Sequence, residues 1–270
     1  MPEEQSIAVA VAQFAPGADK AGNLATIHAL ASRAKGRGAR LVVFPEYSSF
    51  FLPQLGEASV AASEPLEGAF SAGLAAVARE LQVHLVAGMS ESVADSARFS
   101  NTLIAVSPAG ELIAKYRKIH LYDAFGQRES DWIEAGEIEA PETFAIDGLT
   151  VGLQTCYDLR FPEVTRRLAD VGVELVLAPS EWVRGPLKEH HWRTLITARA
   201  LENTLYVAAA DHAPPIGVGN SMVVDPMGVE LATVGEATDV ALAWVTQARV
   251  AQTRTVNPAL ALRRFGVVPR

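Results

Sequence analysis

VGLQTCYDLRFPE, residues 151–163, is the stretch on which the fold and the function of this sequence depend. Its first part, as far as Thr155, predicts a short buried strand, and Phe161-Pro162-Glu163 predicts a helix start with proline in the first turn. The single cysteine of the chain, Cys156, lies between these two elements. Backbone amides and the positive end of a helix dipole favour a thiolate there. A free cysteine is also among the most buried residue types, so this stretch alone leaves both alternatives open.

On both sides of this stretch, apolar strand-like runs alternate with amphipathic helical segments. Continuous apolar runs predict strands buried on both faces, and apolar residues at helical spacing predict helices that cover the sheets. We expect Asn23 to cap the first helix. The pattern predicts strands at residues 7–14, 40–44, 83–89, 102–106, 112–116, 151–155, 174–179, 205–210 and 240–245, a hairpin at 222–231, and helices at 23–37, 66–81, 162–171 and 187–203.

Three longer segments have no clear periodicity. Residues 47–63 are interpreted as a loop with several aromatic residues, and residues 117–141 as an irregular stretch of the length that is usually functional. The tail from Gln247 is expected to pack on a neighbouring surface. Asp147-Gly148 predicts a hairpin turn that leads into the Cys156 strand. Because no linker or repeat divides the sequence, we expect a single α/β domain over residues 1–270, with helices covering a mixed sheet or a pair of sheets.

The composition restricts the possible partners and the compartment. A net charge of −8 and a pI near 5.3 argue against nucleic acid and against an anionic membrane. One cysteine excludes an internal disulfide and a cysteine-rich zinc site, and it suits a reducing compartment. The segment MPEEQSIAVAVAQF, residues 1–14, is acidic before its apolar run, unlike a signal peptide, and no run reaches transmembrane length. We therefore expect a soluble, cytoplasmic protein.

Three apolar strands each end in a reactive side chain. Residues 41–45 lead to Glu46, residues 112–116 lead to Arg117-Lys118, and residues 151–155 lead to Cys156. Ligand sites in helix-covered sheets lie beyond the strand ends, so these side chains can converge. A carboxylate base, a thiol nucleophile and an ammonium at the oxyanion are sufficient for acyl transfer. Taken singly, Glu46 can also be a solvated loop residue and Lys118 part of a basic surface patch.

The sequences around these side chains resemble a known superfamily. FPE (residues 44–46), YRKIHLYD (116–123) and CYDLRFPE (156–163) are similar, in order and in spacing, to the three signature blocks of the nitrilase superfamily of carbon–nitrogen hydrolases. RALEN (199–203) and NSMVVDPMG (220–228) look like further blocks of that superfamily. The resemblance therefore spans nearly the whole chain.

The resemblance implies a fold, an assembly and a catalytic triad. The fold is a four-layer αββα sandwich that dimerises through helices, so we expect a homodimer or a higher homo-oligomer. The triad is Glu–Lys–Cys, carried here by Glu46, Lys118 and Cys156, with no metal and no cofactor. A second glutamate, which matches Glu129, helps to hold the lysine. The backbone amide of Tyr157 is expected to join Lys118 in the oxyanion hole.

The resemblance also implies an activity. The block at residues 156–163 is most similar to the branch of omega-amidases and deaminated-glutathione amidases. We therefore expect cysteine-dependent hydrolysis of a small linear amide through a thioester, with release of ammonia or an amine. Nitrilase and N-carbamoyl-amide hydrolase activities of the same superfamily stay open as alternatives, and so does a non-catalytic redox thiol protein. The natural substrate is not given by the sequence.

Substrate contacts are expected from three loops, at residues 47–53, 122–131 and 182–186. The side chains expected to contact the substrate are Tyr122, Tyr157, Arg160 and Trp182. Amides with a carboxylate at the far end need a cation in the pocket, and the candidates are Arg160, Arg184 and Lys188. An internal ion pair of Arg160 with Asp158 or Glu163 is the alternative for that residue.

Two other features of the sequence carry no assignment. His190 and His191 are adjacent on a helix and do not share a face, so they do not predict a metal site. Arg193 stands where members of the superfamily frequently have an acidic residue, so no role is carried over to it.

Overall fold

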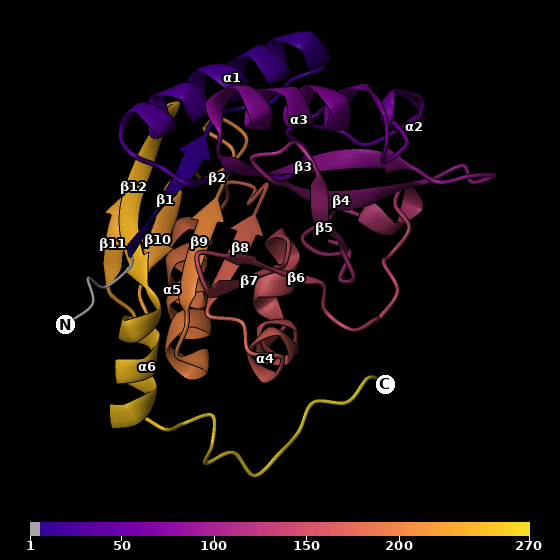
Figure 1. Cartoon of the computed structure of the whole chain (residues 1–270). Helices are drawn as coiled ribbons and strands as arrows, with labels where there is room; N and C mark the ends of the chain where they lie inside the picture. Colours follow the sequence, from indigo (N-terminus) through magenta and orange to yellow (C-terminus); the bar gives the residue numbers. More distant parts are fainter. Residues whose placement is uncertain (1–5) are drawn as a thin grey trace.

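The computed structural model describes residues 6–270, which form two sheets with helices outside both of them (Figure 1). The acidic segment before Ser6 lies outside the described residues. The strands are β1 (Ser6–Gln13), β2 (Leu41–Val43), β3 (His84–Ser92), β4 (Phe99–Val106), β5 (Leu112–Arg117), β6 (Thr143–Ile146), β7 (Leu149–Leu153), β8 (Leu175–Pro179), β9 (Tyr206–Ala210), β10 (Met222–Val224), β11 (Glu230–Thr233) and β12 (Asp239–Thr246). The helices are α1 (Lys20–Gly36), α2 (Glu57–Ala62), α3 (Ala69–Leu81), α4 (Pro162–Asp170), α5 (Lys188–Asn203) and α6 (Gln247–Val256), with short 3₁₀ helices at Glu129–Asp131 and Cys156–Arg160.

Each sheet is mixed and has six strands. The first has the order β12-β1-β2-β3-β4-β5, and the second has the order β11-β10-β9-β8-β7-β6. Three neighbouring strands are parallel in each sheet, β1-β2-β3 in the first and β7-β8-β9 in the second. The carboxyl ends of parallel strands meet at one edge of a sheet, and that edge is where ligand sites form in helix-covered sheets.

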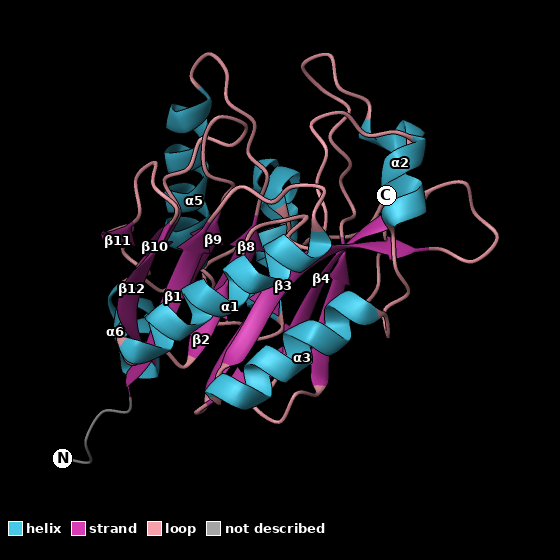
Figure 2. Ribbon diagram, turned by 90° about the horizontal axis from the view of Figure 1, so that it is seen from above, coloured by secondary structure: helices cyan, strands magenta, loops and turns pink. Residues whose placement is uncertain are grey.

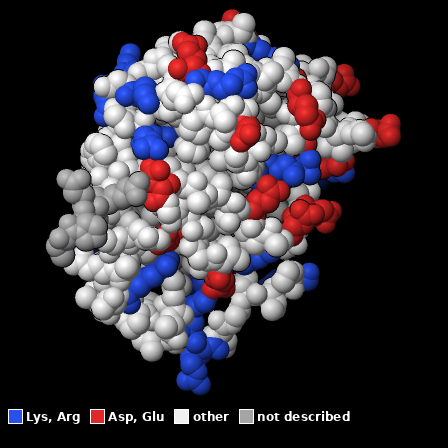
Figure 3. All heavy atoms as spheres, in the orientation of Figure 1, with Lys and Arg blue, Asp and Glu red and all other residues white. Residues whose placement is uncertain are grey.

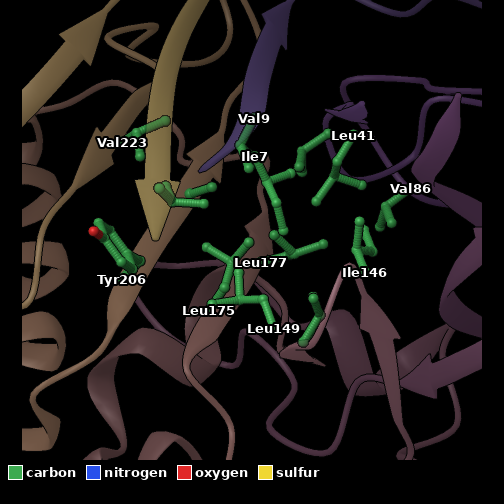
Figure 4. Close-up of a cluster of buried hydrophobic side chains, with 14 of the residues drawn as sticks. Ile7, Val9, Leu41, Val86, Ile146, Leu149, Leu175, Leu177, Tyr206 and Val223 are labelled. Carbon is green, nitrogen blue, oxygen red and sulfur yellow. The ribbon is translucent and has the colours of Figure 1, made fainter. Parts of the chain in front are cut away.

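The innermost layer of side chains joins the two sheets. Along β1, Ile7, Val9 and Val11 pack toward the second sheet, whereas Ala10 and Ala12 face the helices. This alternation follows from the two-residue period of a strand. Figure 4 shows the inner cluster, in which side chains of both sheets interdigitate. A strand buried on both faces needs an uninterrupted apolar sequence, which explains the continuous runs.

Helices cover the outer face of each sheet, which confirms the predicted four-layer αββα sandwich. The helices α1 and α3 lie side by side on the first sheet (Figure 2), through a cluster that includes Ile27, Leu30 and Leu74. The helices α4 and α5 cover the second sheet, through a cluster that includes Trp192 and Ile196. The single domain over residues 1–270 stays a prediction.

The first helix begins earlier than predicted, and Asn23 is not its cap. Asp19 is the N-cap, and its side chain accepts a hydrogen bond from the Gly22 N–H at 3.1 Å. Asn23 is buried one turn inside the helix, where its amide donates to the carbonyl oxygens of Gly17 and Ser49. It therefore ties α1 to the loop that follows Glu46. The prediction failed because an aspartate four residues earlier competes for the same role.

Two helices were missed in segments without a clear period. The tail, in which the sequence shows no clear period, begins with α6, which buries only Val250 and Thr253. One apolar and one hydroxyl side chain are too few to produce an amphipathic pattern. The loop predicted at residues 47–63 likewise contains α2, with one buried residue, Ser59. The hairpin turn at Asp147-Gly148 is confirmed, with positive φ at both residues.

The surface mixes both signs of charge. On the face shown in Figure 3, acidic and basic side chains are interspersed without a broad basic area. None of the helices within residues 6–270 is long and apolar enough to cross a membrane.

Candidate active site

Glu46, Lys118 and Cys156 meet in one cavity at the carboxyl ends of three strands. Glu46 follows β2, Lys118 follows β5 and Cys156 follows β7, so the first two come from one sheet and the third from the other. The Lys118 Nζ atom lies 2.9 Å from Oε1 of Glu46 and 3.0 Å from the carboxylate of Glu129. The lysine side chain is only 2% exposed, so this is a buried ion cluster and not a surface patch.

Every oxygen of the Glu46 side chain has a donor. Oε1 accepts hydrogen bonds from Lys118 and from the side-chain amide of Asn101, the latter at 2.5 Å. Oε2 accepts from the backbone N–H of Glu181 at 2.6 Å. The carbonyl oxygen of Glu181 in turn lies 3.4 Å from the Cys156 Sγ atom and accepts its hydrogen. The backbone of Glu181 therefore links the carboxylate to the thiol.

A glycine on the neighbouring strand lets the Glu46 backbone reach this position. A Cβ atom on Gly88 would lie 2.6 Å from the Tyr47 nitrogen and 2.7 Å from the Cα of Glu46. Real Cβ atoms do not approach backbone so closely, so only glycine fits here. Gly88 also donates to the carbonyl of Pro45 and accepts from the N–H of Ser49, which fixes the turn around Glu46.

Glu129 holds the other side of the lysine. Its carboxylate accepts hydrogen bonds from the Tyr47 hydroxyl and from the Tyr122 N–H, each at 2.6 Å. It is 6% exposed and lies in a short 3₁₀ helix inside the long irregular segment. The position of Glu129 beside Lys118 is the one that the resemblance implies.

Mutual neutralisation keeps these groups charged despite their burial. Burial alone would lower the pKa of Lys118, but the carboxylates of Glu129 and Glu46 outweigh it and raise that pKa well above its usual range. Burial would raise the pKa of Glu129, but Lys118 and the donors from Tyr47 and Tyr122 lower it. A lysine held cationic next to a nucleophile can stabilise an oxyanion.

Cys156 is a buried thiol in a strained turn. Its φ angle is +42°, in the left-handed region that residues with a Cβ rarely adopt, and it is 6% exposed. Burial and the Glu46 carboxylate raise the pKa of the thiol, and Lys118 opposes them only in part. The thiolate that the local sequence favours is therefore not the resting state, and the thiol needs a base before it can attack.

The cavity has a volume of about 620 Å³ and reaches the surface. Its walls come from the three predicted loops and include Tyr47, Phe51, Tyr122, Gln127 and Trp182. The volume suits a small molecule. The prediction that these loops build the pocket is confirmed.

Tyr122, Tyr157, Arg160 and Trp182, the residues expected to contact substrate, all line this cavity. The Arg160 guanidinium lies 4.9 Å from the centre of the Trp182 ring and 5.9 Å from that of Tyr157. Its Nε atom is buried and has no hydrogen-bond partner among residues 6–270.

The alternative ion pair of Arg160 with Asp158 or Glu163 is wrong. The Asp158 carboxylate is occupied by Tyr116, His120 and the Thr155 N–H. Within the described part of the chain, Arg160 makes no ion pair with a carboxylate, and its Nη2 atom lies 3.4 Å from Nδ1 of His191. Its charge therefore faces the cavity.

A second cation lies beside Arg160. The Lys188 ammonium donates to the Tyr122 hydroxyl at 2.7 Å and lies 4.1 Å from the centre of the Phe125 ring. Burial and the charge of Arg160 lower its pKa. Arg184, the third candidate, is instead paired with Glu236 at 3.0 Å and lies 3.5 Å from a carboxylate oxygen of Glu189.

Several polar residues of the site were not predicted. Asn101 bridges the carboxylates of Glu46 and Glu129, at 2.5 and 3.4 Å. His212 donates through Nε2 to the Glu46 carbonyl at 2.7 Å. Glu181 lines the cavity, and burial, Glu46 and Asp211 raise the pKa of its carboxyl group. The only feature of the sequence that could have indicated these residues is that each is a polar residue inside an apolar run or shortly after one.

The three residues left without an assignment, Arg193, His190 and His191, lie outside the cavity. Arg193 pairs with Glu230 and donates to Asn220, so it joins α5 to the edge strand β11. The rings of His190 and His191 are 6.3 Å apart, and no group of three or more His, Cys, Asp or Glu within residues 6–270 is arranged to hold a metal ion.

Comparison with known proteins identifies the family. Residues 8–255 match the sequence profile of the carbon-nitrogen hydrolases. The chain belongs to the carbon–nitrogen hydrolase family. The chain is therefore an enzyme, and the predicted membership of the nitrilase superfamily is confirmed.

Two relatives place this carbon–nitrogen hydrolase among amidases. It is 39% identical over 259 residues to the deaminated glutathione amidase of Escherichia coli O157:H7, covering 95% of this chain and 97% of that protein. The crystal structure of an amidase from Nesterenkonia sp. superposes with a TM-score of 0.79 at 27% identity, covering 96% of this chain and 93% of that chain.

One variant of the Nesterenkonia enzyme shows covalent chemistry. Its structure, with a TM-score of 0.78 and 27% identity, is described as showing covalent addition of the acetamide moiety of fluoroacetamide at the active site cysteine. The match covers 96% of this chain and 94% of that chain. Amide hydrolysis with an active-site cysteine is thus the chemistry of the structural neighbours.

Proposed function

We propose that this carbon–nitrogen hydrolase cleaves a small linear amide through a thioester on Cys156, with Glu46 as the base and Lys118 at the oxyanion. The observation that carries the proposal is the buried Lys118, held between the carboxylates of Glu46 and Glu129 in the cavity that contains the only thiol. Burying one ammonium between two carboxylates is costly for a purely structural purpose. The arrangement is well suited to a charge that forms only during a reaction.

The raised pKa of the thiol assigns the first step to general base catalysis. Glu46 takes the proton as Sγ attacks the amide carbon, and the carbonyl oxygen becomes an oxyanion beside Lys118. In this proposal the backbone N–H of Tyr157 is the second oxyanion donor. Glu46 then returns the proton to the nitrogen, the C–N bond breaks, and ammonia or an amine leaves the thioester.

Water completes the cycle. Glu46 takes a proton from a water molecule that attacks the thioester carbon, and the tetrahedral intermediate collapses with cleavage of the C–S bond. The carboxylic acid leaves, and the proton on Glu46 returns to the Cys156 sulfur. Throughout, Glu129 keeps Lys118 cationic and directed at the oxyanion, because its other acceptor sites are filled by Tyr47 and Tyr122.

The acyl end of the substrate is proposed to carry a carboxylate. Arg160 and Lys188 present two cations to the cavity between aromatic walls, and neither forms an ion pair with a carboxylate within residues 6–270. The E. coli relative is named a deaminated glutathione amidase. Tyr122, Tyr157 and Trp182 would form the walls along which the chain of the substrate lies.

The redox alternative has weaker support. Redox-sensor cysteines have a low pKa and are accessible, whereas Cys156 is 6% exposed and its pKa is raised. Nitriles and N-carbamoyl compounds belong in the same substrate panel as amides, since the same thiol can attack all three. Two further proposals rest on the sequence: a cytoplasmic location, and the homodimer or higher homo-oligomer that the resemblance implies.

Intact-mass spectrometry tests the central proposal. Protein mixed with a small carboxylated amide should gain the mass of the acyl group on Cys156, and hydroxylamine should release it as a hydroxamate. Cys156→Ala should gain nothing and release no ammonia. If the native protein forms no adduct and releases no ammonia from any compound of the panel, the proposed function is wrong.

A further inference from the structure

Asp158 is a fully buried carboxylate for which the proposed reaction has no use. It is 0% exposed, yet it makes no ion pair with lysine or arginine within residues 6–270. Its four closest donors come from two separate parts of the chain. Oδ2 accepts from the Tyr116 hydroxyl at 2.7 Å and from the Thr155 N–H at 3.0 Å. Oδ1 lies 2.8 Å from Nδ1 of His120 and accepts from the His120 N–H at 3.3 Å.

These donors flank two of the three residues of the proposed triad. Tyr116 precedes Lys118 by two positions and His120 follows it by two, while Thr155 directly precedes Cys156. One carboxylate therefore holds the chain on both sides of the lysine and the residue before the nucleophile. Because β5 belongs to the first sheet and β7 to the second, Asp158 also bridges the two sheets at the site.

The turn that Asp158 closes is strained. The left-handed backbone of Cys156 persists only where its surroundings over-determine it. Asp158 fixes this turn twice, since its N–H donates to the Thr155 carbonyl at 2.9 Å while its side chain accepts from the Thr155 N–H. The bonds to His120 and Tyr116 then set the place of the turn relative to the lysine strand.

The imidazole of His120 is held in place for this contact. It stacks on the Phe161 ring with 3.7 Å between ring centres and an angle of 6° between planes. Phe161 in turn packs edge-on against Tyr157, the residue after the nucleophile. An ionised carboxylate has no hydrogen to donate, so the Nδ1 atom of His120 is the donor in its contact with Asp158.

We propose that Asp158, His120 and Tyr116 form a clamp of positioning residues that sets the Cys156 sulfur against Lys118. The clamp touches no substrate and acts through the two residues that do. This inference rests on the proposed roles of Cys156 and Lys118. Loosening the clamp should displace the sulfur from the reacting geometry without changing the walls of the cavity.

The experiment compares single variants of the clamp in the full chain. Tyr116→Phe and His120→Ala should lower kcat by about 10²-fold, the usual cost of misplacing a reacting atom by 1 Å, with KM within a factor of about two. His120→Asn, which keeps an N–H near the position of Nδ1, should restore most of the loss. Asp158→Asn should lower kcat at least as much as Tyr116→Phe, and its melting temperature shows whether the variant still folds.

Tyr206→Phe is the matched control. Tyr206 is also a buried tyrosine, and its hydroxyl accepts from the Thr246 N–H far from the cavity, so its loss should cost stability but not kcat. If the folded Tyr116→Phe and His120→Ala variants keep the native kcat, the clamp is refuted. Equal losses in His120→Asn and His120→Ala would also refute it.

A second measurement needs no substrate. Burial, Glu46 and Lys118 together set the pKa of the Cys156 thiol, so a displaced sulfur should react with iodoacetamide at a rate that differs several-fold from the native rate at neutral pH. Unchanged alkylation rates in both clamp variants would contradict the proposal. Failure of the proposed function is recognised separately, by turnover in Cys156→Ala or by its absence in the native protein.

Discussion

The Nζ atom of Lys118 lies 2.9 Å from Oε1 of Glu46, although 72 positions separate the two residues in the chain. Both side chains are at most 2% exposed. A buried pair of this kind is sensitive to the loss of one partner, which leaves an uncompensated charge at a cost of about 3–5 kcal/mol. Variants of either residue must therefore be compared for folding as well as for turnover.

The first prediction concerns the nucleophile. Iodoacetamide should add once, at Cys156, and abolish turnover, and Cys156→Ala should be inactive but folded. Because burial and Glu46 raise the pKa of the thiol, the alkylation rate should keep rising as the pH increases beyond about 8.5, the ordinary thiol value. Intact mass and ammonia release measure both effects. Full activity in Cys156→Ala would exclude the thioester mechanism.

Lys118 and Glu46 are expected to be irreplaceable by similar side chains. Lys118→Arg should lower kcat by at least about 10²–10³-fold, the cost of removing one oxyanion donor. Glu46→Gln should lower kcat by about 10²–10⁴-fold, the usual contribution of a general base. The forked guanidinium cannot take the place of a point ammonium in a closed site. Lys115→Arg is the control, since Lys115 lies on the same strand in an exposed pair with Glu142. Near-normal rates in Lys118→Arg or Glu46→Gln would mean that the partners of the thiol are wrongly assigned.

Gly88→Ala should damage the site without changing any charged group. The new Cβ would overlap the backbone of Glu46 and Tyr47, so the carboxylate should move and kcat should fall by about 10²-fold, as expected for a displacement of 1 Å. Gly36→Ala, at the end of α1 where a Cβ meets nothing within 4 Å, is the matched control and should be neutral or slightly stabilising. The measurement is kcat and the melting temperature of both variants. Equal values of kcat in Gly88→Ala and Gly36→Ala would contradict the steric argument.

The carboxylate preference should depend on Arg160. Amides with a distal carboxylate should exceed neutral amides of equal length in kcat/KM, and Arg160→Gln should narrow this ratio by about ten- to a hundred-fold, as expected for a charged hydrogen bond worth about 1.5–3 kcal/mol. Rates with neutral amides should change little. Arg193→Gln, on α5 but outside the cavity, is the control. A native protein that hydrolyses butyramide as well as a carboxylated amide would rule out the anion-binding pocket but not the amidase.

Acid should unfold the protein partly through Glu129. Its pKa is lowered in the folded state, so its contribution to stability is complete above the unfolded value of about 4.3 and is lost as the pH falls through the lower folded value. The free energy of unfolding, measured in urea between about pH 3 and 7, should decrease steeply below about pH 4.3. Glu129→Gln should flatten that decrease while lowering stability at neutral pH; an unchanged slope would show that Glu129 is not the group that titrates.

The sequence was sufficient to predict the strands that lead to the proposed triad, because each is an apolar run that stops at Glu46, Lys118 or Cys156 or just before it. It was insufficient for Asn101 and Asp158, since their roles depend on which strands are neighbours. Asn101 reaches Glu46 because β4 lies between β3 and β5, and Asp158 reaches Tyr116 because the two sheets stack. Sheet order and stacking are set by the packing of the whole core, which no local pattern records.

Two electrostatic properties of the site could not be predicted from the local sequence, namely the pKa of the Cys156 thiol and the absence of an ion pair at Arg160. The strand-to-helix position of Cys156 favours a thiolate, but burial of the thiol, together with Glu46 and Glu181 from elsewhere in the chain, raises its pKa and reverses the preference. In the same way, the ion pair of Arg160 with Asp158, the alternative to a substrate contact, does not form because Asp158 is already engaged by three residues. Competition for a partner is visible only once the partners are in place.

Because the three residues of the proposed triad come from two sheets, activity should appear only at a late stage of folding. Glu46 and Lys118 can be ordered when the first sheet forms, but the Cys156 sulfur joins them only when the second sheet docks, and β12 must return across the chain to pair with β1. Contacts so distant in sequence form slowly. During refolding, far-ultraviolet circular dichroism should therefore recover before amidase activity, and the interval between the two signals would measure the docking of one half of the sandwich onto the other.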